Sequence, residues 1–168
     1  DFGAVQCTPQ SPNCLFCPLS GSCRALSEGK VQQLPVKQHR TKTTSRYFNY
    51  IYVRMGAHTL IHKRTEDDIW KNLFELPLVE TEKDLSEEEF LACPQFHALF
   101  AEGEVRMVRT LLRGVKHVLS HRVIYTNFYE VTLPDNSSSF SSYQRVAVED
   151  LGRYAVPRLI HAFLEKYV

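Results

Sequence analysis

The sequence predicts a mixed α/β protein of the α+β kind, in which two helices pack on a mixed or mostly antiparallel β-sheet. Residues 122–133 (RVIYTNFYEVTL) are rich in aromatic and β-branched side chains and alternate between two faces, which is typical of a strand. Residues 158–167 place their apolar side chains on one helical face. Four of the five cysteines lie within residues 7–23, which predicts a small cysteine-rich loop segment ahead of the sheet.

The remaining strands are predicted from short aromatic or β-branched runs separated by turn residues. A turn is expected at residues 56–58, and a loop with a short extended piece at residues 70–79. A Ser-rich loop is expected at residues 134–142. In chain order, the expected strands are residues 47–54, 59–62, 105–112, 115–119, 122–133 and, as a short edge strand, 144–148.

The other helix begins after Ser86, a good N-cap residue that is followed by three acids, Glu87–Glu89, in the first turn. It is expected to cover residues 87–100 and to be bent or divided near Pro94. A single helical turn is expected at residues 148–154, shortly before the closing helix.

Composition indicates one main core with a small appendage, since the 168 residues are 43% hydrophobic and 23% charged. The net charge of +1 excludes a chain that is polybasic throughout. Residues 1–46 carry six Lys or Arg against two acids, a net charge of +4, so the remainder carries −3. The positive charge is therefore concentrated at the start, where it can meet phosphates.

The composition also divides the chain into three predicted parts. Residues 1–29 form the cysteine segment, where three prolines prevent long helices, and residues 30–46 form a linker with five basic residues and no acid. Residues 47–168 form the α+β domain. No apolar run is long enough to span a bilayer and no signal peptide is visible, so we expect an intracellular protein. We also expect a monomer. Because the chain opens on Asp-Phe-Gly-Ala without Met, we expect a piece of a longer protein.

The clustered cysteines, Cys7, Cys14, Cys17 and Cys23, form a C-x6-C-x2-C-x5-C array. Four thiolates make a complete shell for one metal centre, and thiolate-only shells select an iron–sulfur cluster or zinc. Common zinc sites use two short cysteine pairs, whereas this array has a single C-x2-C. The spacing therefore favours an iron–sulfur cluster and leaves zinc as the alternative.

This spacing, with Pro18-Leu19 after the third cysteine, resembles the [4Fe–4S] cluster loop of the endonuclease III-like DNA glycosylases. The residues before it, 1–4 (DFGA), resemble the end of the preceding helix in that superfamily. Later motifs resemble the MutY adenine DNA glycosylases, whose C-terminal domain has a Nudix-like fold. These motifs are residues 34–37 (LPVK), 73–77 (LFELP), 116–122 (KHVLSHR) and 154–157 (YAVP).

MutY proteins remove adenine mispaired with 8-oxoguanine by hydrolysing its N-glycosidic bond, and their C-terminal domain reads the 8-oxoguanine. The resemblance implies a chain that carries the cluster loop and this lesion-recognition domain, with duplex DNA containing an adenine:8-oxoguanine mispair as its partner. The family's catalytic Glu and Asp lie upstream of the cluster, so no catalytic residue is assigned here and the chain alone should be inactive. The four cysteines would hold [4Fe–4S] in the full-length protein. Because metal binding and folding are coupled, we expect the cluster to be absent, or its loop disordered, in the isolated chain.

The resemblance places lesion recognition at Leu119, Ser120 and His121, on a hairpin tip between two predicted strands. Oxidation of guanine turns N7 from an acceptor into an N–H donor and adds a carbonyl at C8. Ser120 Oγ can accept from N7–H, while a backbone N–H can donate to the new oxygen. Leu119 stands where the family usually has phenylalanine. It can wedge beside a base step but has no aromatic face, so we expect a weaker wedge and a retained function.

Two alternatives stay open. The first is a Nudix-type nucleoside-diphosphate hydrolase, whose chemistry needs a Glu-rich helix that holds Mg²⁺ and contains Arg-Glu-x-x-Glu-Glu. Residues 86–94 (SEEEFLACP) offer acids without that Arg-Glu pair, and Pro94 interrupts the helix. The second alternative is a zinc-binding interaction module without a DNA role.

Overall fold

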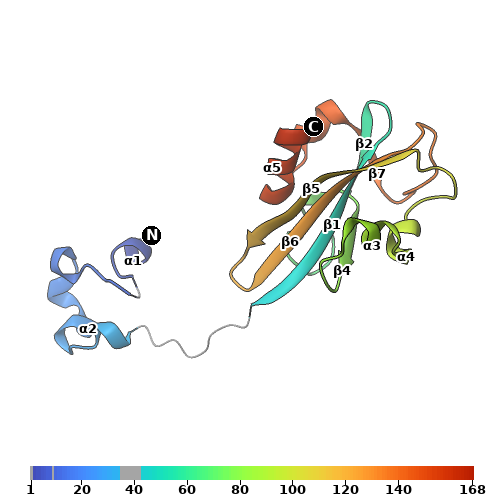
Figure 1. Ribbon diagram of the computed structural model, residues 1–168. Helices are drawn as coiled ribbons and strands as arrows, with labels where there is room; N and C mark the ends of the chain where they lie inside the picture. Colours follow the sequence, from blue (N-terminus) through green and yellow to red (C-terminus); the bar gives the residue numbers. More distant parts are fainter. Residues whose placement is uncertain (1, 9, 35–42) are drawn as a thin grey trace. The chain divides into compact units, whose positions relative to one another are not determined.

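The computed structural model describes residues 2–8, 10–34 and 43–168 (Figure 1). The chain separates into two units, residues 1–42 and residues 43–168. In its described part, the chain contains no helix long and apolar enough to cross a membrane.

The first unit consists of short helical segments joined by turns, as the prolines of this segment predict. None of its described side chains within residues 2–34 is buried. This part therefore has no hydrophobic core among its described side chains, and a metal bound by the cysteines could hold it together instead. Its segments are α1 (Phe2–Val5), η1 (Cys14–Phe16), η2 (Ser20–Ser22), α2 (Arg24–Ser27) and η3 (Val31–Gln33).

The second unit is built on two sheets. The larger has the order β4-β1-β6-β5, in which β1 and β6 are parallel and the two outer strands are antiparallel to their neighbours. The smaller sheet is antiparallel, with the order β3-β2-β7. The mixed sheet predicted from the sequence is thus confirmed. The strands are β1 (Thr44–Arg54), β2 (His58–Lys63), β3 (Phe74–Glu75), β4 (Leu78–Thr81), β5 (Met107–Val118), β6 (Arg122–Thr132) and β7 (Gln144–Ala147).

Helices cover both faces of the larger sheet, as Figure 1 shows. On one face, α5 (Arg158–Tyr167) packs Phe163 flat against Phe128 of β6, with ring centroids 4.1 Å apart. On the other face, Phe90 stacks on Tyr129, with centroids 4.4 Å apart. The second face is covered by α3 (Glu87–Leu91) and α4 (Pro94–His97), and the 3-10 helix η4 (Val148–Arg153) precedes α5.

Most predicted elements are confirmed, and the helix after Ser86 is divided at Pro94 as expected. Ser86 and Glu89 form a capping box, in which Ser86 Oγ accepts from Glu89 N at 3.1 Å and Glu89 Oε2 accepts from Ser86 N at 2.7 Å. The first strand begins at Thr44 and not at Tyr47, because its first three residues already pair with the start of β6.

One prediction was wrong: residues 105–112 and 115–119 are not two strands. They form the single long strand β5, whose register shifts between Thr110 and Leu112 and again between Leu112 and Val115. Gly114 adopts a left-handed backbone, with φ of +68°, and its N–H donates to Asn127 Oδ1 of β6 at 2.9 Å. The glycine therefore marks a bulge inside a strand and does not start a turn.

Candidate nucleic-acid interface

The three residues predicted to read the lesion lie together at the end of the β5–β6 hairpin. Val118 pairs with Val123, and Leu119 N donates to Arg122 O at 2.8 Å. Ser120 and His121 are therefore the two connecting residues, and both are exposed. Leu119 is half-buried against the core cluster on the α5 side of the sheet. We call Leu119, Ser120 and His121 the hairpin tip.

The polar groups of the hairpin tip are unevenly engaged. Leu119 N–H is used within the hairpin, and His121 O accepts from Thr44 N at 3.2 Å. Within the described residues, neither the backbone N–H of Ser120 and His121 nor Ser120 Oγ takes part in a hydrogen bond. The tip therefore offers two backbone donors and one hydroxyl to a ligand.

Thr44, near the end of the predicted linker, lies beside the hairpin tip, because it is the register partner of Arg122 and donates to His121 O. Three of the linker cations predicted to meet phosphate, Lys37, Arg40 and Lys42, lie outside the described residues.

A network of ion pairs fixes the base of the hairpin. Arg122 Nη1 donates to Asp68 Oδ1, and Arg46 Nη1 donates to Asp68 Oδ2 at 2.5 Å. Arg46 also forms two hydrogen bonds to Glu80, both at 2.6 Å. Burial by itself raises the pKa of Asp68, but hydrogen bonds from Arg46, the Ile69 backbone and Arg122 outweigh it and hold the pKa well below the ordinary value.

Asp68 belongs to the loop of residues 64–73, between β2 and β3, and other contacts attach this loop to the core. Arg64 forms two hydrogen bonds to buried Glu75, at 2.9 and 2.8 Å, and Tyr50 OH donates to Glu75 at 3.0 Å. Trp70 and Asn72, within this loop, have positive φ angles of 60° and 70°. Trp70 packs against His117 of β5, with ring centroids 5.8 Å apart. Sequence reasoning missed this network, because its partners are far apart in the chain.

The four predicted metal ligands face one small cavity of about 30 Å³, which Cys7, Cys14, Cys17 and Cys23 all help to line. No three His, Cys, Asp or Glu side chains among the described residues are placed to share a single metal ion. Four thiolates are nevertheless the donor set that a [4Fe–4S] cluster takes in proteins.

The cations next to the cysteines are already paired. Arg24 Nε donates to Glu28 Oε1 at 2.5 Å, and Lys30 Nζ donates to Glu28 Oε2 at 2.7 Å. Both pairs are exposed, so each contributes little to stability and is easily exchanged for another anion.

The acidic helix is shorter than hydrolase chemistry requires. Helix α3 has five residues, and Glu89 is taken up by the capping box at its start. The hydrogen bond from the Ser86 backbone is the main reason that the pKa of Glu89 is lowered. The acids of this helix thus act as first-turn residues, in agreement with the sequence analysis.

Comparison with known proteins agrees with this fold. A family model described as a NUDIX domain matches residues 49–166. The adenine DNA glycosylase of Buchnera aphidicola subsp. Acyrthosiphon pisum is 25% identical over 170 residues, which cover 99% of this chain and 46% of that protein. The adenine DNA glycosylase of Buchnera aphidicola subsp. Schizaphis graminum is 35% identical over 81 residues, or 48% of this chain and 23% of that protein. The chain therefore spans less than half the length of these two relatives.

Two solved structures have a similar fold. One is the complex between the C-terminal domain of mouse MUTYH and human PCNA, with a TM-score of 0.58, 14% identity, and coverage of 73% of this chain and 86% of that chain. The other is MutT, from a study of Aliivibrio salmonicida and Vibrio cholerae, with a TM-score of 0.51, 16% identity, and coverage of 73% and 96%. At these identities the likeness shows the fold alone.

Proposed function

Because the chain belongs to the Nudix domain family, in the MutY-like form found in adenine DNA glycosylases, we propose that its hairpin tip recognises 8-oxoguanine paired with adenine in duplex DNA. One observation carries the proposal. Ser120 and His121 are exposed at the end of the β5–β6 hairpin, which β1 flanks as far as Thr44, and their backbone N–H groups and the Ser120 hydroxyl are not used by any neighbour within the described residues. An exposed strand end of this kind can reach a base edge.

The chemistry of the tip matches the two changes that oxidation makes to guanine. Ser120 Oγ accepts the new N7–H, and the backbone N–H of Ser120 or His121 donates to the new C8 oxygen. Unmodified guanine lacks the C8 oxygen and therefore loses that pairing. At N7 it offers an acceptor, to which the Ser120 hydroxyl can donate instead, so discrimination at N7 depends on the orientation of the hydroxyl. Leu119 supports the contact as an apolar wedge that remains anchored in the core.

The similarity to adenine DNA glycosylases supports a wider assignment. We place residues 1–29 at the end of a glycosylase catalytic domain, residues 30–46 in a linker, and residues 47–168 in the lesion-recognition domain. The parent protein would hydrolyse the N-glycosidic bond of the mispaired adenine, as a base-excision repair enzyme. No residue of this chain is assigned to that step.

The cysteine loop would serve the same protein as a rigid support. Cys7, Cys14, Cys17 and Cys23 would hold a [4Fe–4S] cluster, which supplies the cross-link that a segment without buried side chains lacks. Iron and sulfide analysis of the purified 168-residue chain tests the expectation that the cluster is lost in isolation. Stoichiometric iron would contradict that expectation, and stoichiometric zinc would favour the interaction module.

The decisive experiment compares binding of the chain to two duplexes that differ only in 8-oxoguanine or guanine opposite adenine. We expect tighter binding to the lesion, and we expect Ser120→Ala to reduce that preference by about 1–3 kcal/mol. Ser142→Ala removes another exposed hydroxyl, in the loop before β7, and should leave the preference unchanged. Equal affinity of the unmutated chain for both duplexes would refute the assignment.

A further inference from the structure

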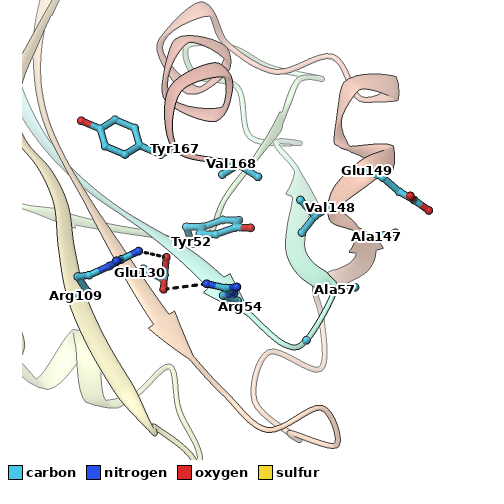
Figure 2. A pocket seen from close by; sticks show the side chains of 11 residues that line it. Tyr52, Arg54, Ala57, Arg109, Glu130, Ala147, Val148, Glu149, Tyr167 and Val168 are labelled. Carbon is cyan, nitrogen blue, oxygen red and sulfur yellow. Dashed lines mark hydrogen bonds and ion pairs between the residues drawn. The ribbon is translucent and has the colours of Figure 1, made fainter.

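A cavity of about 550 Å³ lies at the end of the larger sheet farthest from the hairpin tip (Figure 2). Tyr52 and Arg54 of β1, Arg109 of β5 and Glu130 of β6 contribute to its lining. Tyr167, near the end of α5, lies at its edge. The proposed reading of 8-oxoguanine uses none of these residues.

Within this cavity, one buried carboxylate holds two guanidinium groups. Glu130 is 3% exposed, and its Oε2 accepts from Arg109 Nη2 at 3.0 Å. Its Oε1 lies 3.8 Å from Arg54 Nη1 and accepts no hydrogen bond within the described residues. Figure 2 shows the two arginines approaching this carboxylate from opposite sides.

The arrangement has the properties of an oxyanion site. The side chains of Arg54 and Arg109 are 56% and 58% exposed, so most of their N–H donors remain available. Glu130 neutralises one of the two cations and the exposed Glu149 also lines the cavity, so the oriented N–H donors, and not an excess of positive charge, define the site. Guanidinium groups that are already oriented suit the planar, multidentate binding of phosphate. We call Arg54 and Arg109 the arginine pair.

Further cations stand along β5, but on the other face of the sheet. Arg109 pairs with Glu130 on the α5 face, whereas Lys116 pairs with Tyr125 on the face that α3 and α4 cover. Arg106 and Lys116 are exposed, and neither side chain forms an ion pair or hydrogen bond with the described residues. Arg113 differs, because it donates to Leu85 O at 2.6 Å and lies 3.9 Å from Asp84. Since β5 is the outer strand of the sheet, these cations line an edge that leads directly to the hairpin tip.

From these charges, which border the outer strand of the sheet on its two faces, we infer that the arginine pair binds a backbone phosphate of the DNA about one helical turn from the lesion, and that Lys116 contacts a phosphate close to the lesion. The ten residue steps from Thr44, beside the tip, to Arg54 span about 33 Å along a strand. One turn of B-DNA rises about 34 Å. The inference rests on the proposed function, because it takes the tip as the point that meets the lesion.

An extended polyanion explains the pair better than a small ligand does. Both guanidinium groups stand on the exposed rim of the cavity, where a long strand can pass, and other cations follow along the same strand. Phosphate contacts of this kind would fix the register of the duplex on the domain without reading its sequence.

The test measures affinity for the lesion duplex as a function of salt concentration in Arg54→Gln and Lys116→Gln. Each variant should reduce the slope of log affinity against log salt by about 0.9. Between 50 and 200 mM salt, each variant should then lose about 3.5-fold less affinity than the unmutated chain. The preference for 8-oxoguanine over guanine should not change. Arg109→Lys retains the charge beside Glu130 and should retain the slope.

Shortened duplexes locate the contact. When one flank is cut to about 8 base pairs or fewer, on the side that the arginine pair reaches, the effect of Arg54→Gln should vanish while that of Lys116→Gln remains. Lys83→Gln, beside β4 at the opposite edge of the sheet, is the charge-matched control and should leave the slope unchanged.

Three results would overturn the inference while leaving the proposed function intact. The first is an unchanged salt slope in both variants. The second is an effect of Arg54→Gln that survives truncation of either flank. The third is an Arg54-dependent site for inorganic phosphate, detected by NMR titration, without any change in the DNA salt slope. Failure of the proposed function itself would instead appear as an absent lesion preference in the unmutated chain.

Discussion

Arg122, the residue that follows the hairpin tip, donates a hydrogen bond to Asp68, which lies 54 positions earlier in the chain. The same carboxylate accepts from Arg46 at 2.5 Å. Arg46 belongs to β1 and Arg122 to β6, so Asp68 joins the two parallel strands at the point where the tip begins. The orientation of the hairpin tip thus depends on Asp68, in the loop between β2 and β3.

Replacing Asp68 should therefore disturb both stability and lesion binding. In Asp68→Asn, Arg46 keeps Glu80 and Arg64 keeps Glu75, but Arg122 loses its charged partner. We expect the free energy of unfolding to fall by about 1–2 kcal/mol, as measured by urea denaturation. We also expect weaker binding to the 8-oxoguanine duplex, because the base of the tip is less constrained.

Asp67→Asn provides the matched control. Its side chain is 98% exposed and pairs only with Lys71 among the described residues. The change in unfolding free energy should stay within about 0.5 kcal/mol. If Asp68→Asn behaves like Asp67→Asn in both assays, the network does not support the tip.

A second network gives a prediction for pH. Glu104 accepts hydrogen bonds from the hydroxyls of Ser137 and Ser139 and from Ser138 N, and these lower its pKa from 4.5 to about 2. Because the pKa is lower in the folded state, the stabilisation of this loop is fully present above pH 4.5. It is lost as the pH falls through about 2.

NMR titration of the Glu104 carboxyl carbon measures this directly. The folded chain should show a midpoint near 2, and the Ser137→Ala/Ser139→Ala double variant should show a midpoint shifted back toward 4.5. A midpoint for Glu104 near 4.5 in the unmutated chain would contradict the network.

The elements that the sequence predicted best are those with local causes. Ser86 and Glu89 stand three residues apart and form the capping box that their spacing indicates. The alternation of residues 122–133 predicted a strand, and β6 occupies nearly that range. The exposed hairpin tip was also expected, because it depends on two neighbouring strands and the short turn between them.

The features that the sequence did not reveal depend on partners far away in the chain. The expected strands left a gap at residues 113–114, but the N–H of Gly114 donates to Asn127 of the neighbouring strand, and the chain continues there as one strand. Glu130 belongs to an alternating strand, but helices and loops cover both faces of the sheet, so alternation does not show that its carboxylate is buried. Glu130 and the arginine pair come from three different strands, so no local pattern in the sequence reveals them.

The wedge residue of the tip gives a further prediction. Leu119 is half-buried and has no aromatic face, so Leu119→Phe should add base stacking and strengthen binding to the lesion duplex by about 1 kcal/mol, or roughly fivefold. Fluorescence titration with labelled duplex measures this change. Val118→Phe adds the same ring one residue earlier, on an already exposed side chain, and should give a smaller gain. Equal gains from both variants would show that position 119 is not the wedge.

The turn between β1 and β2 should tolerate no side chain at its first position. Gly56 has a φ of +56°, and a Cβ at this position would lie 2.8 Å from Asp135 Oδ1. Gly56→Ala therefore adds backbone strain to a steric clash, and we expect the free energy of unfolding to fall by about 1–3 kcal/mol. The Gly56→Ala/Asp135→Ala double variant removes the clash but not the strain. Relative to Asp135→Ala alone, it should therefore lose less free energy of unfolding than Gly56→Ala loses relative to the unmutated chain.

Gly152→Ala, where no atom lies within 4 Å of the added Cβ, should change stability by less than about 0.5 kcal/mol. Chemical denaturation of the four variants decides the matter, and equal effects of Gly56→Ala and Gly152→Ala would show that the turn can relax around a side chain.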